Sequence, residues 1–186
     1  MNKYNPDIHH RHSIRLRGYD YSQEGLYFIT ICAPNRKHLF GEIVDDEMQM
    51  NEYGKTVEKC WFEIPQHYPK AVLHEHIVMP NHFHAILEIV GAEYFPPNNN
   101  APNEIKVENI RPLPSAVQCK SGTLGAIIRG FKIGVTKRIG FSVWQRNYHE
   151  HIIRSAKSYQ TISEYIINNP AKWNEDMFNP LNTQKV

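Results

Sequence analysis

This sequence lacks long apolar runs and paired cysteines. No stretch approaches the roughly 20 consecutive apolar residues of a membrane-spanning helix, and the N-terminal residues contain no apolar core typical of a secretion signal. The 3 cysteines, Cys32, Cys60 and Cys119, are far apart, odd in number and without the spacing of a metal motif. We therefore expect a cytoplasmic protein with reduced thiols and no membrane partner.

The chain is long enough for one domain with its own core. It has 186 residues, of which 41% are hydrophobic and 22% charged, as is usual for globular proteins. We expect a single domain over residues 1–186. Residues 1–20 form a basic arm in this interpretation, and the proline- and asparagine-rich residues 91–120 form an irregular insertion rather than a boundary.

Acidic residues are also scarce in the second half of the chain. The formal net charge is only +2, but from Arg111 to Lys157 Glu150 is the only acidic residue among many lysines and arginines. Such a local excess is typical of a polyanion-binding surface. A solvated helix face explains the same charges, so the pattern alone does not decide between the two.

Apolar periodicity predicts seven main elements. Alternating or β-branched runs indicate strands, and apolar residues three and four apart indicate helices. The order is strand, helix, strand, strand, helix, strand, helix, which is the βαββαβ plan of an α+β ferredoxin-like fold with an additional C-terminal helix. In this plan the sheet is antiparallel, and its helices lie on one face. The predicted strands are residues 25–32, 71–79, 82–90 and 141–153; the helices are 51–68, 124–138 and one capped by Ser155 or Ser158; residues 39–44 form a short outer hairpin arm.

His82 and His84 carry the first chemical signal. Side chains alternate along a strand, so both imidazoles lie on one face and Phe83 on the other. Two neutral imidazoles at this spacing can bind one divalent ion. A surface or hydrogen-bonded pair is the alternative, because the chain has 11 histidines.

Tyr165 and Asn169 carry the second signal. Their four-residue spacing places both on one side of the third helix, where they offer a phenol and an amide oxygen. A tyrosine nucleophile beside a metal ion is suited to attack on a phosphodiester. Alternatively, Tyr165 is a core residue next to Ile162 and Ile166, and Asn169 caps a short helix that begins at Pro170.

Three blocks of this sequence resemble one family. The run from Met79 to His84 looks like the HUH motif (histidine, hydrophobic residue, histidine) of single-tyrosine transposases. Residues 144–154 and 164–170 resemble the tryptophan–glutamine block and the tyrosine helix of REP-associated tyrosine transposases. The resemblance covers about residues 26–173 without the insertion. The insertion over residues 91–120 is a departure from the family's pattern, because the shorter members have no segment of this length.

The resemblance implies a DNA-nicking and strand-transfer enzyme. It implies that His82, His84 and Asn169 bind Mg²⁺ or Mn²⁺ and that Tyr165 is the catalytic nucleophile. Its substrate would be single-stranded DNA carrying a hairpin, cleaved to a 5′-phosphotyrosine and a free 3′-OH. The expected DNA phosphate contacts are Arg129, Lys132, Lys137, Arg138, Arg146 and Arg154.

Two other functions remain open at this stage. The same fold with exposed aromatic residues can serve as a non-catalytic binder of single-stranded nucleic acid, such as a hairpin. A metal-dependent hydrolase that uses water instead of Tyr165 is the second alternative. The sequence leaves open whether the protein is a monomer or a homodimer, which DNA sequence it recognises, and whether His149 or His151 acts as a base for Tyr165.

Overall fold

A computed structural model describes residues 20–91, 122–180 and 182. Almost all of the predicted basic arm and of the predicted insertion lies outside the described residues. The elements are, in chain order, β1 (Gly25–Cys32), η1 (Pro34–Arg36), β2 (Gly41–Val44), β3 (Glu47–Met50), α1 (Glu52–Phe62), α2 (Ile64–His67), β4 (Ala71–Met79), β5 (His82–Ile89), α3 (Leu124–Ile139), β6 (His149–Ile153), α4 (Ala156–Ile167) and η2 (Trp173–Glu175), where η marks a single 3₁₀ turn.

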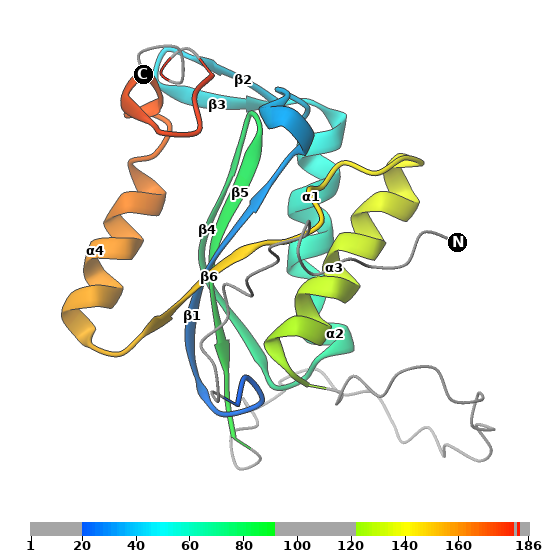
Figure 1. Cartoon of the computed structure of the whole chain (residues 1–186), viewed down its shortest axis with the longest axis vertical. Coiled ribbons are helices and arrows are strands. Elements are labelled where there is room, and N and C mark those ends of the chain that lie inside the picture. The colour runs from blue at the N-terminus through cyan, green and yellow to red at the C-terminus, as the bar shows by residue number, and fades with distance from the viewer. Residues whose placement is uncertain (1–19, 92–121, 181, 183–186) are drawn as a thin grey trace, which may run out of the picture.

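One antiparallel sheet organises the molecule. Its strand order is β4-β5-β1-β6, and a separate two-stranded sheet joins β2 to β3. The two central strands, β5 and β1, are not consecutive in the chain, as the ferredoxin-like plan requires. The predicted α+β fold is therefore confirmed. Helices α1 and α3 cover one face of the sheet, and α4 covers the opposite face (Figure 1).

Strand β5 is buried on both faces: one face packs against α1 and α3, and the other packs against α4. Phe83 points to the α1–α3 side, where its ring lies 5.0 Å from Trp61 and 5.4 Å from Phe131. Ile86 belongs to a smaller cluster with Ile153 and Ile166 beneath α4. Because side chains alternate along a strand, residues 82 and 84 share the α4 side with Ile86.

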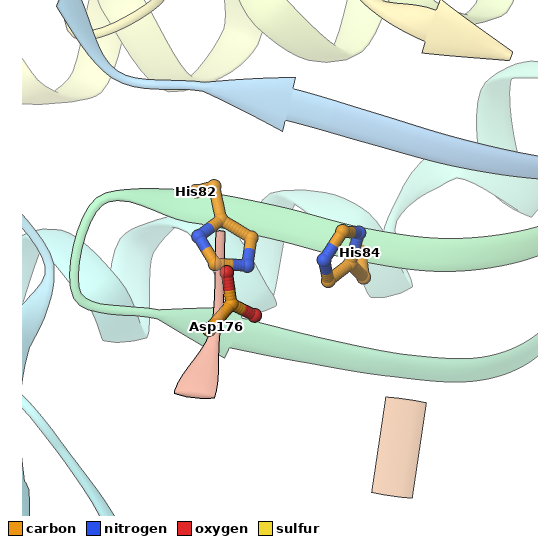
Figure 2. Close-up of side chains that lie close together, drawn as sticks. All are labelled: His82, His84 and Asp176. Atoms are coloured by element: carbon orange, nitrogen blue, oxygen red, sulfur yellow. The ribbon is translucent and has the colours of Figure 1, made fainter. Parts of the chain in front are cut away.

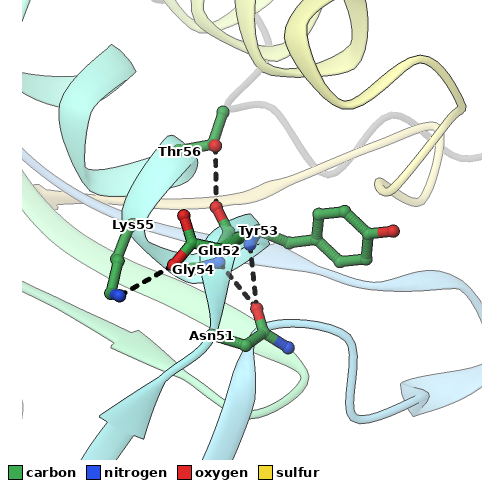
Figure 3. A network of polar contacts seen from close by, with 6 residues as sticks. All are labelled: Asn51, Glu52, Tyr53, Gly54, Lys55 and Thr56. Atoms are coloured by element: carbon green, nitrogen blue, oxygen red, sulfur yellow. Dashed lines mark hydrogen bonds and ion pairs between the residues drawn. The ribbon is translucent and has the colours of Figure 1, made fainter.

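Asn51 determines where α1 begins. Its side-chain oxygen accepts hydrogen bonds from the backbone amides of Tyr53 and Gly54 at 2.9 and 3.1 Å (Figure 3). These bonds satisfy two amides that have no partner inside the helix. Lys55 pairs with Glu52 over 2.8 Å on the outer surface of the same turn. The predicted cap at Asn51 is therefore confirmed.

The prediction of one continuous helix over residues 51–68 is wrong. It is divided into α1 and α2 at Glu63. Pro65 has no backbone N–H to donate to the Trp61 carbonyl, so the helical hydrogen-bond pattern breaks at this point. The backbone amide of Glu63 donates to that carbonyl instead.

The predicted strand over residues 141–153 is too long, because only His149–Ile153 pair with β1. The segment just before β6 is hydrogen-bonded to α3 instead of to β1. The Lys132 ammonium donates to the carbonyls of Gln145, Arg146 and Asn147 at 2.6, 3.1 and 3.4 Å. This lysine therefore ties the segment to α3 and keeps it out of the sheet.

The predicted hairpin arm at residues 39–44 is confirmed and has a partner strand, β3, which the sequence did not reveal. The turn between β2 and β3 is formed by Asp45 and Asp46, at φ angles of 51° and 61°. Two consecutive residues with positive φ are the requirement of the type I′ turn that matches strand twist. No helix among the described residues is long and apolar enough to cross a membrane.

Candidate functional site

His82 and His84 lie at the start of β5 on its α4 side, and their ring centroids are 4.4 Å apart. Their side chains approach Asp176, which follows η2 (Figure 2). One possible ligand atom from each of the three residues lies within 4.8 Å of the others. All three are buried, with exposed fractions of 0%, 1% and 8%. The described part of the chain thus contains a buried His–His–Asp group suited to a divalent ion.

Asn81 fixes the orientation of the His82 ring. Its side-chain amide donates to the carbonyls of Arg36 and Phe178 at 3.2 and 2.8 Å, which leaves its oxygen 2.8 Å from His82 Nδ1. An amide oxygen only accepts, so we assign the imidazole proton to Nδ1. The lone pair of His82 Nε2 then faces the site, which is how proteins usually orient histidine ligands.

Thr30 on β1 performs the same task for His84. Its hydroxyl lies 2.8 Å from His84 Nδ1, and the phenol of Tyr165 lies 3.2 Å from Nε2 on the other side of the ring. With the proton on Nδ1, Nε2 accepts from the tyrosine hydroxyl. The side chain predicted as nucleophile and a side chain predicted as metal ligand are therefore in direct contact.

Asn169 and Asp176 complete the site from the C-terminal side. The Asn169 amide nitrogen donates to Asp176 Oδ2 at 3.1 Å, and the Phe178 backbone amide donates to Oδ1. Asn169 therefore does not cap a helix at Pro170: the next helical turn is η2, and its N-cap is Lys172. That alternative for Asn169 is wrong.

Two buried atoms at this site have no hydrogen-bond partner among the described residues. They are His82 Nε2 and Asn169 Oδ1. A buried polar atom without a partner costs roughly 1–3 kcal/mol, so two such atoms at one site need an explanation. An imidazole nitrogen and an amide oxygen are both ligand atoms for a divalent ion. The residues present thus fit the ion that the resemblance implies.

The protonation states also fit a metal centre. Burial lowers the pKa of His84 to about 3 and holds the pKa of His82 well below its usual range, so both rings are neutral at pH 7. Neutral imidazole is the form that binds metal. Partial burial, with a smaller contribution from Asp176, raises the pKa of Tyr165 to about 12. Without an ion the phenol is protonated at neutral pH.

Tyr165 is not a core residue, because 40% of its surface is exposed. It lies on α4 with its ring edge toward Phe28, at 6.1 Å and 86° between planes. The buried position on this side of α4 belongs to Ile166. The alternative of a core tyrosine is therefore wrong.

The sequence did not reveal Asp176 or Arg36 as members of the site. Asp176 enters through the η2 turn, which no periodic pattern signals. Arg36 donates to the Met177 carbonyl at 2.8 Å and lies 5.6 Å from the centre of the Phe178 ring. Its φ is +53°. Positive φ in a non-glycine residue is uncommon, and clustered examples often occur at functional sites.

Four of the six predicted DNA contacts, Arg129, Lys132, Lys137 and Arg138, lie on α3. Helix α3, with the four residues predicted from it, lies on the face opposite Tyr165 (Figure 1). Arg138 pairs with Glu63 at 2.7 Å and donates to Cys60 Sγ, and Lys132 holds the loop described above. Arg129 and Lys137 are exposed on α3. Arg146 lies in the loop before β6, and Arg154 lies between β6 and α4; both are exposed.

Comparison with known proteins identifies relatives over nearly the whole chain. An uncharacterised protein of Haemophilus influenzae is 47% identical over 179 residues, which cover 94% of this chain and 96% of the relative. This chain belongs to the same family as that protein. No protein-family model matches the sequence.

Two further relatives carry transposase names. A candidate REP-associated tyrosine transposase of the same bacterium is 24% identical over 82% of this chain and 74% of its own length. The solved structure of a REP-associated tyrosine transposase bound to a REP hairpin matches 93% of this chain and 74% of that chain, with a TM-score of 0.56 and 18% identity. The resemblance to these transposases is confirmed, and the fold is theirs.

Proposed function

We propose that this protein nicks and rejoins single-stranded DNA through a 5′-phosphotyrosine formed on Tyr165. One observation carries the proposal: the Tyr165 hydroxyl lies 3.2 Å from His84 Nε2, at the edge of the buried His–His–Asp group. The relative solved with a REP hairpin supports hairpin DNA as the substrate class. A nucleophile beside a metal centre matches the chemistry of phosphodiester transfer.

Four side chains would hold the ion: His82, His84, Asp176 and, through its oxygen, Asn169. When bound, Mg²⁺ or Mn²⁺ supplies positive charge that polarises the phosphate and stabilises the charge developing on it. A ligand set of mixed nitrogen and oxygen favours Mn²⁺, since imidazole suits that ion better than it suits Mg²⁺. Asn81 and Thr30 keep both imidazoles aimed at this position.

Tyr165 is the nucleophile in the proposed reaction. Its phenol oxygen attacks the phosphorus atom, forming one P–O bond while the bond to the 3′ oxygen of the preceding nucleotide breaks. The phenol proton is lost and the leaving 3′ oxygen gains a proton, so the products are a 5′-phosphotyrosine and a free 3′-OH. Attack by a 3′-OH on the phosphotyrosine reverses these steps and joins strands.

The positions of Tyr165, Asn169 and Asp176 in the fold support the proposal. Tyr165 lies in the last turn of α4, and Asn169, two residues beyond the end of the helix, donates to Asp176. Such pre-positioning lowers the entropic cost of the reaction. Arg36 adds a positive charge near His82, whose pKa it helps to lower, and that charge is well suited to the incoming phosphate.

A nicking assay on hairpin-bearing single-stranded DNA tests the proposal. Tyr165→Phe removes only the hydroxyl and keeps the ring beside Phe28, so we expect a folded protein that binds DNA and produces no nick. Tyr53→Phe is the matched control, because Tyr53 is also 40% exposed but lies on α1, across the sheet. Normal nicking by Tyr165→Phe would refute the proposed nucleophile. Binding without nicking by the unmodified protein in Mn²⁺ would favour a non-catalytic binder.

A further inference from the structure

A trough runs around the edge strand β6: its larger part lies between β6 and the first turns of α4, and its smaller part reaches the α1–α3 side of the sheet. It consists of two adjoining hollows of about 580 and 350 Å³, which share His151, Ser155 and Ser158. The larger one is the size of a small-molecule site. Its remaining lining residues are Phe28, Lys157, Thr161 and Ile162, and those of the smaller one are Tyr21, Glu150, Ile152 and Arg154.

Phe28 connects this trough to the candidate catalytic site. Its ring stacks on His84 with centroids 5.2 Å apart and planes at 27°, and it meets the edge of Tyr165. The same side chain lines the larger hollow. A chain segment leaving the Tyr165 hydroxyl along this side of the sheet therefore enters the trough directly.

The lining of the trough matches the chemistry of a nucleotide. Phe28 offers an apolar ring on which a base can stack, and Ser155 and Ser158 offer hydroxyls. Lys157 lines the larger hollow and Arg154 the smaller one, so cations follow its length. Glu150 is the one acidic lining residue, and it lies in the smaller hollow, away from Phe28. The charge and the shape of the trough thus favour a nucleic acid strand, which is a polyanion with flat bases.

We infer that the trough binds the nucleotide of single-stranded DNA that adjoins the cleaved phosphate. In this arrangement one base stacks on Phe28, and the sugar–phosphate backbone passes Lys157 and Arg154. The inference rests on the proposed function for its orientation, because Tyr165 marks the cleaved phosphate. Stacking on an aromatic ring accepts any base, so the trough contributes affinity without reading sequence.

The base-stacking step is tested by binding measurements that need no cleavage. All proteins carry Tyr165→Phe and are kept in EDTA, so a failure of the proposed catalysis does not affect the result. The probes are a fluorescent oligodeoxythymidylate of about ten residues, within the usual range of single-strand site sizes, and an abasic strand of equal length. Phe28→Leu should weaken thymidylate binding by about 5-fold to about 150-fold, given about 1–3 kcal/mol per stacked base.

The abasic strand gives the decisive comparison. Phe28→Leu should leave its affinity unchanged, because it has no base to stack. Phe62→Leu is the matched control, since Phe62 is a 54% exposed aromatic residue on α1, across the sheet. Equal loss for both strands, or loss for neither, would overturn the inference. If Phe28→Leu does not fold, Ser158→Leu fills both hollows, and it must weaken binding of the thymidylate strand.

The phosphate contacts are tested by salt dependence. Lys157→Gln and Arg154→Gln should each reduce the slope of log affinity against log salt by about 0.7, the value for one contact to a single strand. Lys59→Gln, an exposed lysine of α1, should leave the slope unchanged. Unchanged slopes for both trough variants would show that the backbone does not follow this path.

Discussion

Asp176→Asn removes the one carboxylate of the candidate metal centre. The change keeps the shape of the side chain, and the oxygen that accepts from the Phe178 amide can be retained. The new amide group would face the Asn169 nitrogen, but Asn169 can rotate its own unpartnered oxygen into that position. We therefore expect the variant to fold without metal, while it loses the negative charge beside His82 and His84.

The magnitude follows from linkage. Mn²⁺ at 100 times its Kd stabilises the unmodified protein by about 2.7 kcal/mol, which raises Tm by roughly 5–11 °C in a chain of this size. Loss even of an outer-shell partner weakens metal binding about 10–100-fold. At the upper value the same Mn²⁺ concentration stabilises the variant by only about 0.4 kcal/mol, or roughly 1–2 °C.

Thermal unfolding with and without Mn²⁺ measures this effect. Glu175→Gln is the matched control, because it removes the same charge from the adjacent, exposed residue. We expect the control to keep the full shift in Tm. An equal Mn²⁺ shift in Asp176→Asn and the unmodified protein would refute the assignment of Asp176 as a ligand.

Three further predictions follow from the same geometry. In EDTA the protein should lose stability as the pH falls from about 6.5 toward 4, because the unfolded chain binds a proton at His84 and the folded chain, in which this residue has a pKa of about 3, does not. His84 contributes up to about 1.4 kcal/mol per pH unit to this loss. In urea titrations His84→Gln should remove this part of the pH dependence, while the part that comes from His82 remains. Lys132→Met should destabilise the fold by about 1–3 kcal/mol, since three loop carbonyls lose their donor, whereas Lys137→Met should change the free energy of unfolding by less than about 0.5 kcal/mol. Neutralising Arg129 and Lys137 together should lower the salt slope of DNA binding by about 0.7 per lost contact if α3 touches DNA, and an unchanged slope would remove α3 from the interface.

Local patterns carried much of the fold and half of the site. The alternation in β5 placed His82 and His84 on one face. The four-residue spacing placed Tyr165 with Asn169, although α4 ends at Ile167 and Asn169 lies in the turn that follows it. Both patterns are geometric consequences of regular secondary structure, so the sequence is sufficient to reveal them. The structure brings all four side chains together.

Long-range contacts account for what the sequence did not reveal. Asp176 reaches the histidines only because the chain turns back after α4, and no periodicity encodes that turn. The strand predicted over residues 141–153 failed because Lys132, on another element, binds the carbonyls of Gln145, Arg146 and Asn147. Tertiary hydrogen bonds of this kind override a local preference for β-structure.

The covalent intermediate is the most direct test of the central claim. The unmodified protein is incubated with hairpin-bearing single-stranded DNA and Mn²⁺, denatured and digested, and the peptides are analysed by mass spectrometry. We predict a nucleotide attached through its 5′-phosphate to the peptide containing Tyr165, and a free 3′-OH on the released strand. A nicked strand without any adduct would make water the nucleophile, and an adduct on Tyr148 or Tyr159 would contradict the assignment of Tyr165.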